Sequence, residues 1–116
     1  MKEFLLLFRA DLGEIGEASP AEVEGWNQQW MDWIGGIAAQ NKLAEGGNHL
    51  AADGRVVRSR GVVTDGPYTE TKESVLGYII IKVKSYEEAV TIAKACPLLN
   101  GEGNSVEVRE IGSPPL

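Results

Sequence analysis

Unbroken apolar runs mark two strands in the middle of a sheet. Residues 4–8 are all apolar, and residues 75–81 are mainly apolar before lysines return at Lys82 and Lys84. Such runs are typical of strands covered on both faces. Residues 105–111 instead alternate between polar and apolar side chains, which predicts a strand with one face toward water.

Two helices are predicted, each after a capping-box spacing. Ser19-Pro20-Ala21-Glu22 places a cap at Ser19 and begins a helix at Pro20, and Ser85 with Glu88 repeats the spacing before a helix that ends ahead of Pro97. In the first helix close packing could offset the cost of Gly35 and Gly36. Its apolar positions recur at steps of three and four and predict a broad face that covers the sheet: Val23, Trp26, Trp30, Trp33, Ile34, Ile37 and Ala38.

The pattern is weaker between residues 42 and 64. It predicts a short irregular strand, a loop and another strand, with residues 59–61 as a tight hairpin connection to a β-branched run at 62–64. Residues 65–68 are expected to leave regular structure as an ordered loop, because Pro67 has no backbone donor and restricts the residue before it.

The predicted order is strand, helix, two or three strands, helix, strand. Short right-handed connections then favour a single α+β domain over residues 1–116: a ferredoxin-like sandwich with an antiparallel sheet and both helices on one face. Two helices leave the other face of the apolar central strands uncovered. We therefore expect two sheets to pack face to face in a homodimer.

Composition excludes several classes of protein. The 11 basic and 17 acidic residues give a formal charge of −6, and no basic cluster favours direct contact with nucleic acid or anionic membranes. No apolar run is long enough to span a bilayer, and the start is unlike a signal peptide. The single cysteine, Cys96, excludes an internal disulfide and favours a cytoplasmic location. Neither metal-ligand spacing nor a glycine-rich phosphate loop is present, so no cofactor or metal is expected.

A motif over residues 65–73 carries a family resemblance. Asp65-Gly66-Pro67-Tyr68-Thr69-Glu70-Thr71-Lys72-Glu73, together with Gly77-Tyr78, the helix end at Cys96-Pro97 and the strand at residues 106–109, resembles the YCII-related family, in the branch named for a DGPF motif. Tyr68 stands where the branch name has phenylalanine. The resemblance implies a ferredoxin-like fold that forms a dimeric α/β barrel.

Several residues near this motif are site candidates. Asp65 is either a general base or the residue that closes a turn made rigid by Pro67. Lys72 and Glu73 either form a solvated pair or contact a ligand, and Tyr68 is either a packing ring or a ligand contact. Arg109 shares a strand face with Glu107, where the two could pair or form the rim of a site.

His49 is either the other catalytic residue or an ordinary loop or strand residue. It is a catalytic candidate because histidine is the residue type that exchanges a proton most readily near neutral pH. It follows Gly46-Gly47, where a flexible backbone could admit a ligand. The wider family is thought to use a histidine and an aspartate, with the histidine early in the chain. This sequence has no histidine before residue 49, so only Asp65 corresponds to that pair.

Two other features are expected to be structural. Cys96 lies at a helix end whose dipole disfavours a thiolate, so a buried thiol is expected. The tryptophans are expected in the core, where Trp30 or Trp33 could border a cavity between helix and sheet.

Two functions from different classes remain. The first is an enzyme that acts on a small molecule by acid–base proton transfer, of the elimination or isomerisation type, with Asp65 and His49 as catalytic residues. The second is a non-catalytic ligand-binding or regulatory module that acts through protein contacts. The resemblance implies that the second would be linked to transcription, because related domains occur beside sigma factors.

Overall fold

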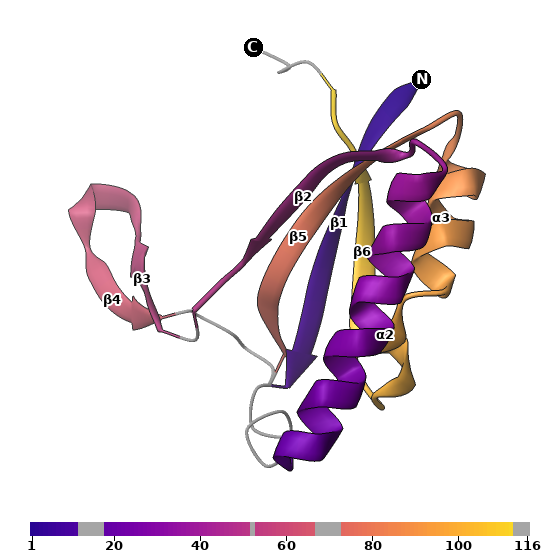
Figure 1. Ribbon diagram of the computed structural model, residues 1–116. Helices are drawn as coiled ribbons and strands as arrows, with labels where there is room; N and C mark the ends of the chain where they lie inside the picture. The colour runs from indigo at the N-terminus through magenta and orange to yellow at the C-terminus, as the bar shows by residue number, and fades with distance from the viewer. Residues whose placement is uncertain (12–17, 52, 67–72, 113–116) are drawn as a thin grey trace.

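The computed structural model of the chain describes residues 1–11, 18–51, 53–66 and 73–112 (Figure 1). The elements follow one another as β1 (Lys2–Asp11), α2 (Pro20–Ala39), β2 (Leu43–His49), β3 (Gly54–Val57), the 3-10 turn η1 (Ser59–Gly61), β4 (Val63–Gly66), β5 (Glu73–Val83), α3 (Tyr86–Lys94), the 3-10 turn η2 (Pro97–Asn100) and β6 (Ser105–Glu110).

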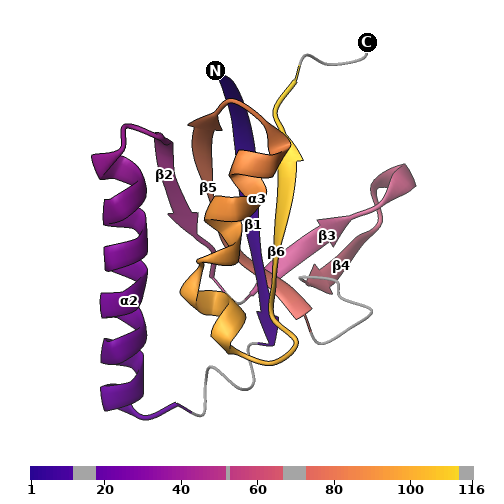
Figure 2. The same cartoon turned by 90° about the vertical axis from the view of Figure 1, so that its right-hand side faces the viewer.

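The main sheet has four antiparallel strands in the order β2-β5-β1-β6. Both helices lie on one face of this sheet, as Figures 1 and 2 show from two directions. The predicted α+β architecture is confirmed, and it is consistent with a ferredoxin-like fold. No helix in the described ranges combines the length and the apolar character needed to cross a bilayer.

The core lies between the helices and alternate residues of the two central strands. Phe4 and Leu6 of β1 pair with Ile81 and Ile79 of β5, and all four side chains are buried. Strand alternation places every second residue on the helix side. The core is completed by Phe8, Ile37, Val83, Ala89, Ala93 and Cys96.

Helix α2 begins as predicted but packs more loosely than predicted. Ser19 Oγ accepts from the Glu22 backbone N–H at 3.2 Å, and Glu22 Oε1 accepts from the Ser19 N–H at 3.3 Å. Of the predicted apolar face only Ile37 is buried, while Trp33 and Ile34 are partly buried and Val23, Trp26 and Ala38 are exposed. The reason is position: α2 runs along the β2 edge, and its N-terminal half extends past the end of β2 (Figure 2).

The predicted close packing at Gly35 and Gly36 is wrong. A Cβ atom at either position would meet no atom within 4 Å outside the helix's own backbone. The glycines therefore keep their cost in helix stability without a compensating contact among the described residues.

Helix α3 and its C-terminal end follow the prediction. Ser85 Oγ accepts from the Glu88 N–H at 3.2 Å, and Cys96 is buried directly after the helix. Burial raises the pKa of the Cys96 thiol to about 11. The expected buried thiol is confirmed, and removal from water is the cause of its raised pKa.

Strands β3 and β4 form a separate two-stranded ribbon, here called the hairpin arm (residues 54–66), which projects away from the helices (Figure 1). The predicted tight connection is confirmed at η1, where Arg60 has a φ of 69°. The radius of gyration is 15.7 Å, against about 13 Å for a compact domain of this size. The arm extends the molecule instead of adding to its core.

The start of the predicted loop at Asp65 is wrong. Asp65 and Gly66 belong to β4, where they pair with Arg55 and Gly54 across the ribbon. The reason is that the pairing of β3 with β4 continues through Asp65 to Gly66, the residue before Pro67, and so keeps both residues in the strand. Pro67 and Tyr68 lie outside the described residues.

Candidate functional site

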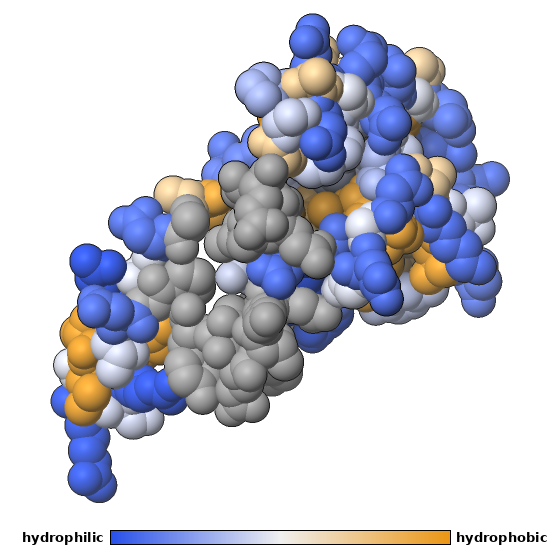
Figure 3. All heavy atoms as spheres, turned by 90° about the horizontal axis from the view of Figure 1, so that it is seen from below, coloured by the Kyte–Doolittle hydropathy of each residue, from blue (hydrophilic) through white to orange (hydrophobic). Residues whose placement is uncertain are grey.

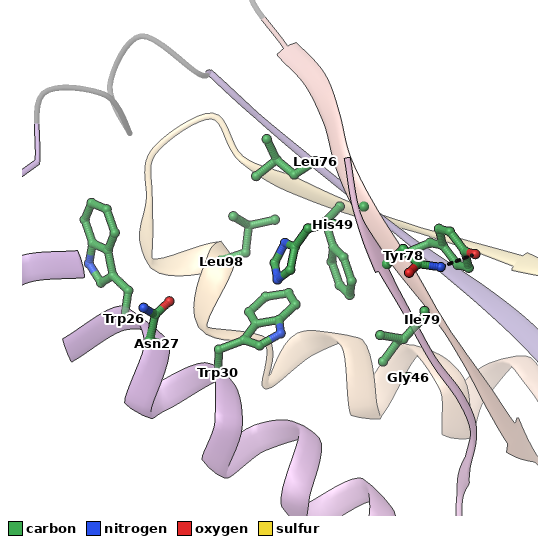
Figure 4. Close-up of a pocket in the computed structure, with 13 residues that line it drawn as sticks. Trp26, Asn27, Trp30, Gly46, His49, Leu76, Tyr78, Ile79 and Leu98 are labelled. Atoms are coloured by element: carbon green, nitrogen blue, oxygen red, sulfur yellow. Dashed lines mark hydrogen bonds between the residues drawn. The ribbon is translucent and has the colours of Figure 1, made fainter. Parts of the chain in front are cut away.

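A cavity of about 370 Å³ lies between the N-terminal half of α2 and the β2–β5 pair. Helix α2 contributes Trp26, Asn27 and Trp30, and β2 contributes residues 46–49 (Figure 4). Its remaining described lining comes from Phe8, Leu76, Gly77, Tyr78, Ile79 and Leu98. We call it the His49 cavity. Its size lies within the usual range for small-molecule sites.

Aromatic side chains hold one wall of the His49 cavity in place. The Trp30 ring meets Phe8 edge to face at 4.6 Å and Trp33 at 5.3 Å between centroids. Trp33 is fixed in turn, because its Nε1 donates to the Ile92 carbonyl of α3 at 3.2 Å. Such edge-to-face packing favours one ring orientation. Trp30 therefore presents its outer surface to the cavity from a supported position.

His49 faces this wall from the end of β2. Its ring centroid lies 6.4 Å from that of Trp30, with the planes tilted by 42°. Figure 4 shows the imidazole and the Trp30 indole next to each other in the cavity. Among the described residues, the His49 side chain makes this ring contact and has no hydrogen-bond partner. Its two nitrogens are thus available to a molecule in the cavity.

A bulged stretch of β2 shapes the opposite wall. The register between β2 and β5 shifts on both sides of Glu45. Gly47 has a φ of 65°, and a Cβ there would overlap the Tyr78 carbonyl of β5. Only glycine fits this close approach. The bulge brings His49 opposite Gly77, and Figure 4 shows the Tyr78 ring turned away from Trp30, where its hydroxyl accepts from Asn48 Nδ2 at 3.1 Å.

The structure does not bring Asp65 to the His49 cavity of the same chain. Asp65 lies on the hairpin arm, where its Oδ1 is 3.5 Å from Arg55 Nε and its side chain is 95% exposed. A pair this exposed contributes little to stability. Asp65 is absent from the described lining of the cavity.

Arg109 lies on the other face of the sheet. It pairs with Leu5 of β1, whose side chain points away from the helices, and its Nη1 donates to Glu107 Oε2 at 3.2 Å. Arg9 donates to Glu107 Oε1, also at 3.2 Å. The pKa of Glu107 lies below its usual value, mainly because Arg109 donates a hydrogen bond to its carboxylate and also because the positive charge of Arg9 is nearby. The predicted Glu107–Arg109 pair is confirmed, away from the His49 cavity.

The remaining site predictions lie outside the described structure. Tyr68 and Lys72 are not among the described residues, and for Glu73 only the backbone, at the start of β5, is described. Their suggested roles stay predictions. Among the described residues, no three His, Cys, Asp or Glu side chains cluster so that they could hold a metal ion.

Sequence reasoning anticipated part of the His49 cavity. Trp30 beside a cavity and His49 after Gly46-Gly47 were expected, whereas Trp26 and Asn27 were not expected there. A signal for Trp26 was present: it lies one helical turn before Trp30 and so shares its face.

Comparisons with known proteins place the chain in a family. The model of the YCII-related domain matches residues 12–112. An uncharacterized protein of Rhizobium meliloti (strain 1021) is 40% identical over 50 residues, which cover 43% of this chain and 40% of that protein. The match thus spans less than half of that relative's length. The family match covers most of the chain, and the chain belongs to the YCII-related family.

Proposed function

We propose that this chain is a homodimeric domain that binds a small molecule in the His49 cavity and that His49 transfers a proton to or from it. The observation that supports the proposal is the position of the chain's single histidine, in the cavity beside the Trp30 ring with no protein hydrogen-bond partner among the described residues. We also assign the chain to the DGPF-motif branch, on the motif that begins at Asp65.

The chemistry that fits this site is proton transfer at carbon. A neutral imidazole takes a proton from a carbon next to a carbonyl, and the electron pair moves onto the carbonyl oxygen. If the substrate has a carbon–carbon double bond beyond that carbon, the carbonyl re-forms, the imidazolium returns the proton to the far carbon of the double bond, and the double bond moves next to the carbonyl, which completes an isomerisation. If the next carbon instead carries a leaving group, the carbonyl re-forms, a carbon–carbon double bond forms, and the group departs with the electron pair of its own bond and takes the proton from the imidazolium, which completes an elimination. Both reactions need one group that alternates between base and acid, which histidine supplies.

In this proposal Asp65 can act only in the cavity of a second copy of the chain. It lies on the projecting hairpin arm and does not line the cavity of its own chain in the described structure. A catalytic role for Asp65 therefore requires that the arm of one copy reaches the cavity of another.

Two surfaces support the homodimer. The first is the sheet face opposite the helices, where Leu5, Leu7 and Ile80 form a half-buried apolar centre beside Arg9 and Glu107. Charges of both signs at the edge of an apolar patch suit a two-fold contact, in which each patch meets its own copy.

The second surface is the hairpin arm. Its Val57 and Val63 are 69% and 59% exposed, and an isolated two-stranded ribbon is marginally stable in water. The arm carries Arg55, Arg58 and Arg60 but one acid, whereas the whole chain has a net charge of −6. The acidic body of a second copy is thus a complementary partner for it.

Deuterium exchange tests the proposed reaction. A panel of uncharged enolisable ketones, esters and amides is incubated with the protein in D₂O, and NMR follows exchange at the carbon next to the carbonyl. We expect catalysed exchange of at least one member, lowered about 100-fold or more in His49→Gln. Asp65→Asn, compared in parallel, shows whether the arm contributes. Exchange that His49→Gln leaves unchanged would contradict the role of His49.

Light scattering tests the dimer. We expect a particle of twice the 12.5 kDa chain mass at micromolar concentration, and its dissociation in Leu7→Asp. Val90→Asp is the matched control, because Val90 is also partly exposed but lies on α3. A wild-type monomer would overturn the homodimer.

A binding result without exchange would favour the regulatory alternative. In that case a stoichiometric protein partner should be recovered with the wild-type chain as bait.

A further inference from the structure

A second hollow adjoins the His49 cavity along the same helix. It has a volume of about 410 Å³ and lies between α2 and the segment from η2 to β6. Its described lining includes Gln29 of α2 and Asn100, Gly101 and Asn104. We call it the Asn100 hollow. It shares Trp26, Trp30 and Leu98 with the His49 cavity, so the two spaces meet along these three side chains.

The two spaces have one chemical feature in common. None of the described residues that line them is Asp, Glu, Lys or Arg, although these types make up 24% of the chain. Where it contacts these walls, a ligand with a formal charge would therefore lose water without gaining an opposite charge, which disfavours its binding. His49, when protonated, is the single described exception in the lining.

Amides supply the polar groups in place of charges. Asn27 lines the His49 cavity, and Gln29, Asn100 and Asn104 line the Asn100 hollow. Asn104 Nδ2 donates to the Leu98 carbonyl at 3.1 Å, whereas Asn27, Gln29 and Asn100 have no side-chain hydrogen-bond partner among the described residues. Each amide both donates and accepts. Such groups suit uncharged ligand groups that also donate and accept, such as carboxamides or hydroxyls.

The tryptophans add a preference for flat rings. Trp26 is 43% exposed, and Trp30 is held by its edge-to-face contacts with Phe8 and Trp33. Both indoles border both spaces. Offset stacking on an indole favours a planar aromatic or unsaturated ring.

We infer that the His49 cavity and the Asn100 hollow form one continuous site for an uncharged planar ligand whose edge carries amide-like or hydroxyl groups. The inference rests on the proposed function, because it names the class of molecule that would meet His49. It also excludes carboxylates, phosphates and amines as the preferred class.

Three matched probes test this class. Naphthalene-2-carboxamide is neutral, 2-naphthoate is an anion and 2-naphthylmethylamine is a cation, and all share one ring system. NMR follows the indole N–H signals of Trp26 and Trp30, with Trp33 as an internal reference because it lines neither space. At pH 7.5 we expect the carboxamide to shift both signals and to bind at least tenfold more tightly than either charged probe.

The outcomes separate the two proposals. Tighter binding of the anion or the cation at Trp26 and Trp30 would overturn the neutral class while leaving the cavity as a binding site. Because both indoles border both spaces, continuity is read from the side-chain amide signals: shifts at Asn27 without shifts at Gln29 and Asn100 would overturn the continuity of the two spaces. No shift with any probe would contradict both this inference and the proposed binding function.

A charge introduced into the site provides an independent test. Asn27→Asp should shift the preference toward the cation, so that 2-naphthylmethylamine gains at least tenfold over the carboxamide relative to the wild type. Asn41→Asp is the matched control: Asn41 is exposed, lies outside both linings and has a φ of 58°, which aspartate also tolerates. If Asn27→Asp unfolds the chain, Gln29→Glu repeats the test in the Asn100 hollow. An unchanged preference in the folded variant would overturn the inference.

Discussion

The two neighbouring glycines of β2 offer a sharp test of how the wall of the His49 cavity is built. Gly47 has a φ of 65°, and a Cβ atom there would overlap the Tyr78 carbonyl and lie 3.0 Å from the Ile79 Cα. At Gly46 a Cβ would meet nothing within 4 Å. Gly47→Ala and Gly46→Ala therefore make the same chemical change one residue apart, in different surroundings.

The expected cost of Gly47→Ala has two parts. The left-handed conformation costs an alanine about 1–2 kcal/mol. Relief of the overlap must move β2 away from β5 and weaken their pairing, by about 1–2 kcal/mol for one or two backbone hydrogen bonds. The free energy of unfolding should thus fall by about 2–4 kcal/mol in Gly47→Ala, against about 0.5 kcal/mol or less in Gly46→Ala.

Thermal and urea unfolding at one fixed protein concentration measure both variants. For a domain of this size a loss of 2–4 kcal/mol corresponds to a fall in Tm of about 8–16 °C. Because His49 follows Gly47 by two residues, Gly47→Ala should also weaken binding of naphthalene-2-carboxamide more than Gly46→Ala does. Equal stability of the two variants would refute the close approach of β2 to β5.

Three further changes probe other parts of the fold. Gly35→Ala should raise the free energy of unfolding by about 1 kcal/mol, because a Cβ there meets nothing within 4 Å; a destabilised variant in urea unfolding would point to a close contact at that position. Trp33→Phe replaces the indole with a smaller ring and removes the Nε1 donor to the Ile92 carbonyl, so urea unfolding should show a loss of about 1–3 kcal/mol from the lost hydrogen bond and packing, and no loss would mean that this side chain links α2 to α3 only weakly. Burial raises the pKa of the Cys96 thiol from 9.0 to about 11. Below pH 9 the thiol is protonated in both the folded and the unfolded chain. As the pH rises from 9 towards 11 the unfolded chain loses this proton first, so the free energy of unfolding falls by up to about 3 kcal/mol. Cys96→Ala should therefore show a shallower fall in stability over that interval, and equal slopes would contradict the raised pKa.

Local patterns predicted the elements that the main core holds together. Three such patterns are the apolar run at residues 4–8, the capping box at Ser19 and the alternation at residues 105–111. Each reflects contacts that form in any sheet with helices on one face. The order of strands and helices along the chain follows from such patterns, because burial on one face leaves a periodic trace in the sequence.

The site was harder to predict because it depends on distances between elements. The exposure of Trp26 follows from where α2 crosses the end of β2, and periodicity within the helix carries no information about that crossing. The β2 bulge at Gly47 depends on the register with β5. Asp65 was expected in a loop because Pro67 follows it, whereas strand pairing with Arg55 extends through it.

The charges on the hairpin arm bear on aggregation, because the arm exposes the edges of a two-stranded ribbon. Two exposed ribbons with bare backbone edges could join side by side and continue into open-ended aggregates. Arg58 and Arg60 flank the turn of the arm close to Val57 and Val62, and in Figure 3 blue hydrophilic atoms surround the orange apolar ones at this end of the molecule. Like charges at the two tips would repel such a pairing. The positive charges of Arg58 and Arg60 therefore disfavour edge-to-edge pairing of two such ribbons and favour contact with an acidic surface.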